Sequence, residues 1–292
     1  AYCNFLVELD IKHFDTSEVT DMSYMFQYCQ DLTSLDVSNF NTKYVVDMSY
    51  MFQECNTIKE LNVANFDTSG VQNMLYMFAN CKSLTSINLS KFDTSQVTIM
   101  SNMFFQCSNL TSIDLSSFNT KNVKQMDHMF QSCNSVPSLD LSNFDTKLVE
   151  NMRYMFYHCE SLTSVNLKNF ETNSLTDMKN IFDSCFKLKS LDLSMFNTEK
   201  VDSLYYSFAK CNSLTSININ NFNTEKVTNM DSLFYGCTSL TEINLRSFNT
   251  EKVESFSTTF GQCSKDLKVY IKTEHNSKFI EKFNETITII NE

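Results

Sequence analysis

The hydrophobic positions of this chain recur every 26 residues. Two phenylalanine columns with this step begin at Phe14 and Phe26, and a cysteine column begins at Cys3. The column accounts for all 11 cysteines, which are Cys3, Cys29, Cys55, Cys81, Cys107, Cys133, Cys159, Cys185, Cys211, Cys237 and Cys263. Self-similarity at a fixed period of this length is the signature of a repeat architecture. A candidate site must therefore be sought among residues that stand 26 positions apart.

The first half of each unit carries apolar residues at helical spacing. Val19, Met22, Met25, Phe26 and Cys29 stand at i, i+3, i+6, i+7 and i+10, and most of the residues between them are polar. This spacing places the apolar residues on one face of a helix. We therefore expect a short helix in each unit.

The second half of each unit alternates apolar and polar residues. Leu35 and Val37 are separated by Asp36, and this period of two is typical of a strand with one buried face. A Phe-Asx-Thr triplet follows the strand, as in Phe40, Asn41 and Thr42. Asx and Thr side chains bond nearby backbone N–H groups, so they can turn the chain and cap the next helix without glycine.

These elements predict one elongated α/β solenoid. Identical strands one unit apart stack in parallel, and parallel crossovers are right-handed almost without exception. Helices are wider than strands, so the parallel sheet should line the concave face and the short helices the convex face. We expect about ten repeats over residues 1–263 and a C-terminal cap over 264–292 with a strand, a helix over 277–283 and an extended segment.

The charge and hydropathy of the chain argue against several classes of partner. A net charge of −11 does not suit a nucleic-acid backbone, which needs a basic stripe. No run of about 20 apolar residues occurs, so we expect no membrane insertion within the chain. Cys3 is already in repeat register, so we expect Ala1 to be a cut through a longer protein.

The cysteine spacing favours buried free thiols. A disulfide framework has irregular spacings, and zinc sites need two ligands close in sequence, whereas each unit here contributes one cysteine at an equivalent place. Free cysteine packs like a small hydrophobic residue. Pairing of neighbouring columns in an oxidising setting is the alternative.

The repeated pattern L-T-S-L-[D/N]-L-S-x-F-[D/N]-T-x-x-V-x-x-M-x-x-M-F-x-x-C resembles that of the BspA-like leucine-rich repeat surface proteins. The resemblance covers residues 1 to about 263. It implies a leucine-rich-repeat solenoid in an extracellular or cell-surface protein that takes part in adhesion and protein binding. The resemblance does not identify the partner.

One polar column lies between the two buried residues of each strand and should point to solvent. Its members are Asp or Asn with serines on either side, and they are Asp36, Asn62, Asn88, Asp114, Asp140, Asn166, Asp192, Asn218 and Asn244, preceded by Asp10. The column could keep an exposed sheet soluble, dock a protein or glycan partner, or hold a cation between stacked carboxylates. In the docking interpretation, departures from the repeat set local specificity, and they are Glu60, Lys168, Asn220, Glu242 and Arg246.

We expect no catalytic residues, no metal site and no cofactor. His13, His128, His158 and His275 sit at four different places in the repeat, so no ligand cluster or catalytic triad is implied. The sequence therefore favours a non-enzymatic binding or adhesion module, with a spacer or stalk that has no ligand of its own as the alternative. Three glycosylation sequons occur, at Asn88, Asn109 and Asn284.

Overall fold

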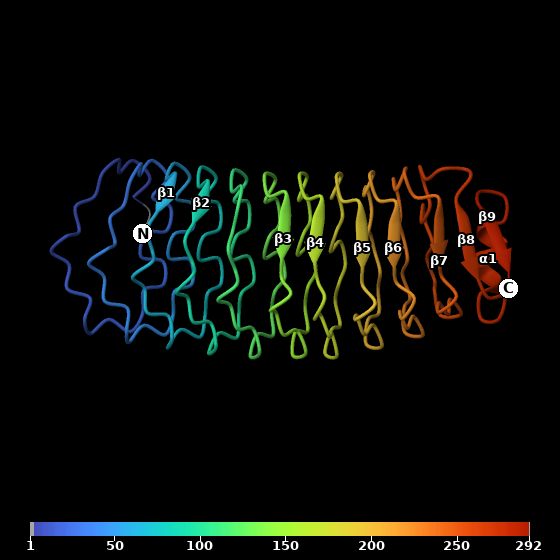
Figure 1. The fold of residues 1–292 in the computed structure, drawn as a ribbon, viewed down its shortest axis with the longest axis horizontal. Coiled ribbons are helices and arrows are strands. Elements are labelled where there is room, and N and C mark those ends of the chain that lie inside the picture. Colours follow the sequence, from blue (N-terminus) through green and yellow to red (C-terminus); the bar gives the residue numbers. More distant parts are fainter. Residues whose placement is uncertain (1–2, 292) are drawn as a thin grey trace.

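The computed structural model describes residues 3–291, which wind into a coil of stacked turns (Figure 1). Each turn is offset from the next by 26 residues, because Glu60 pairs with Ser86 and Leu139 with Val165, in parallel. The strands are β1 (Glu60–Leu61), β2 (Ser86–Ile87), β3 (Ser138–Asp140), β4 (Ser164–Asn166), β5 (Ser190–Asp192), β6 (Ser216–Asn218), β7 (Glu242–Asn244), β8 (Lys268–Ile271) and β9 (Thr288–Asn291). The parallel solenoid with a 26-residue repeat is confirmed, whereas its right hand stays a prediction.

The strands follow the predicted alternation of buried and exposed side chains. In β3, Leu139 is buried between exposed Ser138 and Asp140, and β5 repeats the pattern. Hydrogen bonding groups the strands as β1–β2, β3–β4, β5–β6 and β7–β8–β9. The inward side chains join one continuous hydrophobic core that runs the length of the array.

The helices expected in the first half of each unit are absent from the described residues, and tight turns stand in their place. Tyr24 and Tyr28 have φ of 59° and 60°, in the left-handed region, which no α-helix tolerates. The N–H groups of Phe26 and Tyr28 donate to the carbonyls of Met51 and Gln53 in the next turn, at 2.9 and 2.8 Å. These donors would be used inside one segment in a helix. Two successive turns thus bury the same apolar stripe that the helix prediction explained.

The hydrogen bonds between the turns form a second ladder, which we call the turn ladder. Its parallel bridges begin at Asp21, Asp47 and Asn73 and recur along the array. Left-handed backbone costs about 1–2 kcal/mol per residue outside glycine. We attribute the left-handed conformation to this ladder, because each such turn is hydrogen-bonded to the equivalent turn beside it.

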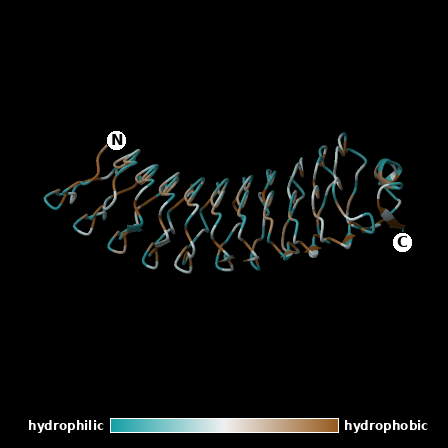
Figure 2. Ribbon diagram, turned by 90° about the horizontal axis from the view of Figure 1, so that it is seen from above, coloured by the Kyte–Doolittle hydropathy of each residue, from teal (hydrophilic) through white to brown (hydrophobic). Residues whose placement is uncertain are grey.

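The strands follow the outer edge of the curve, contrary to the expected concave position. In Figure 2 the array forms a shallow arc, and the strands lie along its convex side with the tight turns opposite. The expectation assumed wide helices on the far side. Tight turns stack instead at hydrogen-bonding distance, for example from the Phe78 N–H to the Met103 carbonyl at 3.0 Å. The strand side, where the ladder is interrupted between β2 and β3, takes the wider spacing.

The cysteine column lies in the core, as predicted. The cysteines from Cys29 to Cys237 are buried and Cys263 is half-buried, whereas Cys3, in the first turn, is exposed; all are free thiols. The Cys107 thiol donates to the Phe78 carbonyl of the preceding turn at 3.1 Å, and the other buried cysteines make the equivalent bond from Cys55 onward. Burial raises the pKa of Cys107 to about 12, so the thiol stays protonated at neutral pH.

The Phe-Asx-Thr triplets turn the chain without glycine, as expected, although no helix follows them. The Asp93 carboxylate accepts the Ser95 N–H at 2.9 Å, which closes an Asx turn. Buried Thr94 donates its hydroxyl to the Asn119 carbonyl of the next turn at 3.0 Å and accepts the Asn119 N–H at 2.8 Å. The threonine column therefore ties each turn to the next by its hydroxyl, and a second bond is added where an asparagine N–H faces the threonine.

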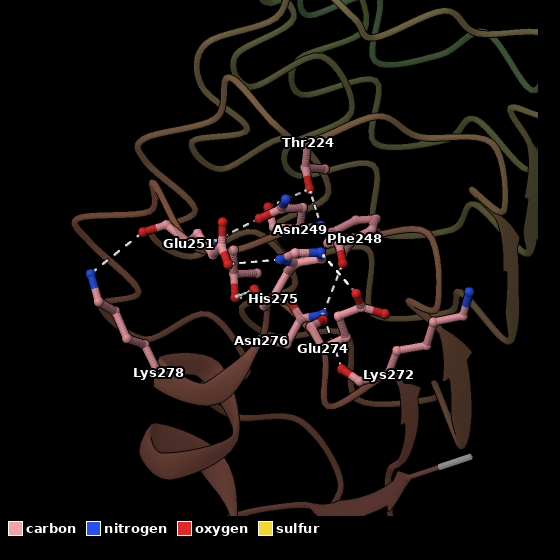
Figure 3. A network of polar contacts seen from close by, with 10 residues as sticks. Thr224, Phe248, Asn249, Glu251, Lys272, Glu274, His275, Asn276 and Lys278 are labelled. Carbon is pink, nitrogen blue, oxygen red and sulfur yellow. Dashed lines mark hydrogen bonds and ion pairs between the residues drawn. The ribbon is translucent and has the colours of Figure 1, made fainter.

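The C-terminal elements follow the prediction, with β8, helix α1 (Ser277–Phe283) and β9 in order. Asn276 lies 26 residues after Thr250, so it takes the next place in the threonine column. Its side-chain carbonyl accepts the Thr250 hydroxyl at 2.9 Å, and its amide donates to the Phe248, Lys272 and Glu274 carbonyls (Figure 3). This buried residue joins the last repeat to the start of α1.

Candidate binding surface: the strand face

The exposed side of the strands, which we call the strand face, collects the predicted Asp/Asn column. Side chains pointing away from the core alternate with buried ones, as in Ser164 and Asn166 of β4. The members from Asp36 to Asp192 are exposed, while Asn218 and Asn244 are half-buried. Parallel pairing aligns the column in register, because Asp140 lies opposite Asn166 and Asp192 opposite Asn218.

The Asp/Asn column also turns the chain at the end of each strand. Asp114 accepts the Ser116 N–H at 3.0 Å, and Asp140 accepts the Ser142 N–H at 3.0 Å. Every other predicted site residue makes the same bond to the residue two positions on: Asp36, Asn62, Asn88, Asn166, Asp192, Asn218 and Asn244. The sequence interpretation missed this role, for which the repeated Asx-x-Ser spacing was the available signal.

The carboxylates of the strand face are held in their charged form. Hydrogen bonds from the Ser116 side chain and backbone lower the pKa of Asp114, and the equivalent serines do the same for Asp36, Asp140 and Asp192. Neighbouring amides spread this charge. The Asn166 amide donates to the Asp140 carboxylate at 2.9 Å, and the Asn218 amide donates to Asp192 at 3.0 Å.

The strand face is hollowed at both ends of the array. A hollow of about 710 Å³ near the N-terminal end is lined by Thr33, Ser34, Leu35, Asp36, Lys59, Glu60, Leu61, Asn62, Ser86, Ile87 and Asn88. A second, of about 340 Å³, is lined by residues that include Asn220, Glu242, Arg246 and Tyr270. Four of the five predicted departures from the repeat therefore line a hollow, and Lys168 lines neither.

A family described as "Mycoplasma protein of unknown function, DUF285" matches residues 2–87, 83–189 and 161–273. The chain belongs to this family. No curated protein matches the chain at a significant level.

Comparison with solved structures finds similar proteins at low sequence identity. A leucine-rich repeat protein from Bacteroides ovatus aligns with a TM-score of 0.54 at 17% identity, over 94% of this chain and 76% of that one. The functional domain of InlJ from Listeria monocytogenes, described as including a cysteine ladder, aligns at 14% identity with a TM-score of 0.26, over 91% and 62% of the two chains. The Bacteroides structure supports a leucine-rich-repeat-like solenoid.

His128, His158 and His275 lie in separate local contacts. His128 bonds Gln131 at 2.5 Å, His158 bonds Glu160 at 3.4 Å, and His275 bonds Glu251 at 2.7 Å. Within residues 3–291, no three His, Cys, Asp or Glu side chains are grouped so that they could hold a metal ion. No helix in the same range has the length and apolar character needed to span a bilayer.

The tight turns carry an aromatic stripe that the sequence interpretation missed. Tyr24 stacks on Tyr50 with ring centroids 4.6 Å apart, and Tyr50 stacks on Tyr76 at 5.0 Å. Further along, His128 stacks on Tyr154 at 4.8 Å. The signal was present in the sequence, because all five side chains share one 26-residue column. Their faces cover one another, so the stripe presents mainly ring edges to solvent.

Proposed function

We propose that this chain is a non-enzymatic binding module of an extracellular or cell-surface protein, whose strand face docks a protein or glycan partner. The observation that carries the proposal is the in-register column of ionised carboxylates and amides on one exposed face. Within each group of hydrogen-bonded strands, such a surface offers hydrogen-bond donors and acceptors at a spacing of about 4.8 Å. An adhesion role, as in the BspA-like proteins that the repeat resembles, is consistent with this chemistry.

The spacing of Asp and Asn along the column supports recognition over a purely solubilising role. Asp and Asn close the same turn equally well, as Asp114 and Asn88 show. Local structure therefore does not require a carboxylate at any of these positions. A solubilising face has no need of amides that bond neighbouring carboxylates, whereas a docking face gains specificity from that pattern of charge.

The double variant Asp114→Asn/Asp140→Asn tests the strand face. Asparagine keeps both turns, so the free energy of unfolding should be unchanged or slightly higher. Adhesion of beads coated with the protein to a panel of immobilised matrix proteins and glycans should fall, with the largest loss at low salt.

The matched control is Asp93→Asn/Asp145→Asn, which makes the same charge change in turns beyond the strands. The control should adhere like the parent. If the strand-face variant also adheres like the parent on every surface, the strand face is not the working surface and the spacer alternative is favoured.

A further inference from the structure

The negative charge of the chain is concentrated at its N-terminal end. Residues 1–62 hold ten Asp and Glu against three Lys, a net charge of −7 out of −11 for all 292 residues. The rest of the chain is close to neutral by comparison. The array therefore has an electrostatic polarity along its length, with the acidic end at the first turns.

The larger hollow of the strand face lies within this acidic end. It adjoins another hollow of about 300 Å³, lined by Glu8, Leu9, Asp10, Ile11, Lys12, Ser34 and Asp36. The two hollows share Ser34 and Asp36, so they form one trough, which we call the N-terminal trough. Its floor is made by the buried residues Leu35, Leu61 and Ile87, each 5–7% exposed.

Four carboxylates line the N-terminal trough, and these are Glu8, Asp10, Asp36 and Glu60. All four are exposed, and none makes an ion pair among residues 3–291. Hydrogen bonds from Ser38 lower the pKa of Asp36, and nearby Lys12 adds to this effect, so the carboxylate is charged at neutral pH. Lys12 and Lys59 also line the trough, so its four carboxylates and two lysines leave a net charge of −2 beside a narrow apolar floor.

We propose that the N-terminal trough binds an extended, lysine- or arginine-rich segment of a partner protein. The proposal rests on the docking role of the strand face and adds the chemistry of the occupant. Cationic side chains can reach the carboxylates while their methylene stems cover the apolar floor. Four turns span about 15–20 Å, which suits five or six residues of extended chain.

The hollow at the other end of the strand face does not have this character. Glu242 there is accompanied by Arg246, whose guanidinium lies 4.9 Å from the Tyr270 ring centroid. Glu242 and Arg246 cancel, so this hollow carries no net charge, whereas the N-terminal trough carries a net charge of −2. It serves as the internal comparison for the N-terminal trough.

The probe is a fluorescent eight-residue peptide of alternating lysine and threonine, with a glutamate–threonine peptide as its matched control. Fluorescence anisotropy should show binding of the lysine peptide alone, weakening as salt is raised from 50 to 300 mM, concentrations chosen to shorten the screening length. The variant Glu8→Gln/Glu60→Gln should weaken binding about tenfold, since two of the four carboxylates are neutralised. Neither side chain makes a described hydrogen bond, so the fold should be intact.

The variant Glu199→Gln/Glu225→Gln makes the same charge change at exposed positions outside the strands, and its affinity should match that of the parent. Equal weakening by both variants would show binding to net charge only and overturn the proposal. Failure of the lysine peptide to bind the parent would also overturn it. In either case, a loss of adhesion in Asp114→Asn/Asp140→Asn would leave the proposed docking role standing.

Discussion

At the residue scale, Asp183 is a carboxyl group buried in the array. It is 4% exposed and accepts hydrogen bonds from Asn180 at 3.0 Å and Ser184 at 2.8 Å. Burial raises its pKa above the ordinary value of 3.8, although the two hydrogen bonds and the charges of Lys210 and His158 oppose this. The side-chain carbonyl of Asn180 is buried without a hydrogen-bond partner.

The substitution Asp183→Asn should stabilise the protein at neutral pH. A carboxyl whose pKa is raised by folding favours the folded state while protonated, and this stability is lost as the pH rises through the raised pKa. The amide removes that loss and supplies a donor that can satisfy Asn180, so the free energy of unfolding at pH 7 should rise by about 1 kcal/mol.

Denaturant unfolding from pH 4 to pH 8 checks this expectation. The parent should lose stability relative to the variant as the pH rises. A difference that is constant with pH would show that Asp183 titrates at its ordinary value. Asp177→Asn, at a less buried carboxylate of the same repeat, is the control and should track the parent.

At the element scale, the sequence was sufficient for the buried positions and insufficient for the extent of the strands and for the turns. The period of two identified Leu35 and Val37 as buried, yet no strand forms there, and the first strand is β1. The bounds of α1 were predicted correctly. The stripe from Val19 to Cys29 fits a helix and a pair of stacked turns equally well. The stacked turns differ from a helix in the left-handed backbone at Tyr24 and Tyr28. Tyrosine gives no local signal for that conformation. The hydrogen bonds that hold it come from the next turn, which a single unit does not reveal.

The same limit applies to the candidate site. Alternation placed the Asp/Asn column on the exposed side of the strands, and the structure agrees. The sequence analysis placed that side on the concave face, and this was wrong, because it assumed wide helices opposite the strands. Without those helices, the strands lie on the outer edge of the arc (Figure 2). The hollows depend on how short side chains from several turns combine, which no single column encodes.

The junction between the last repeat and the cap depends on Asn276. The substitution Asn276→Ala removes an acceptor for Thr250 and a donor to three carbonyls, all in a buried place. Unsatisfied buried polar groups cost about 1–3 kcal/mol each. We therefore expect the cap over residues 264–291 to lose about 2–4 kcal/mol of stability.

Hydrogen–deuterium exchange should show this loss as faster exchange in β8, α1 and β9, with the central turns unchanged. Asn276→Thr, which restores the residue type of the column, should lose less because its hydroxyl can still accept from Thr250. Uniform destabilisation of the whole array would mean that Asn276 does not act at the junction.

At the scale of the whole molecule, each turn is held by contacts with its two neighbours. Phe130 is fully buried and stacks on Phe104 and Phe156, each with a ring-centroid distance of 5.8 Å. The cysteine, threonine and turn-ladder bonds likewise join one turn to the next. Stability in such an array is close to a sum over turns and their interfaces. The length of the body can therefore change without loss of the fold, and with it the extent of the strand face.

Deletion of residues 107–132, one whole repeat, tests this account most directly, with Phe130→Ala as the comparison. Circular dichroism and denaturant unfolding should show a folded, shorter array for the deletion, because every remaining turn keeps an equivalent neighbour. Phe130→Ala should lose about 3–5 kcal/mol, because it leaves a cavity in the ring stack. An unfolded deletion variant beside a stable point variant would contradict the nearest-neighbour array.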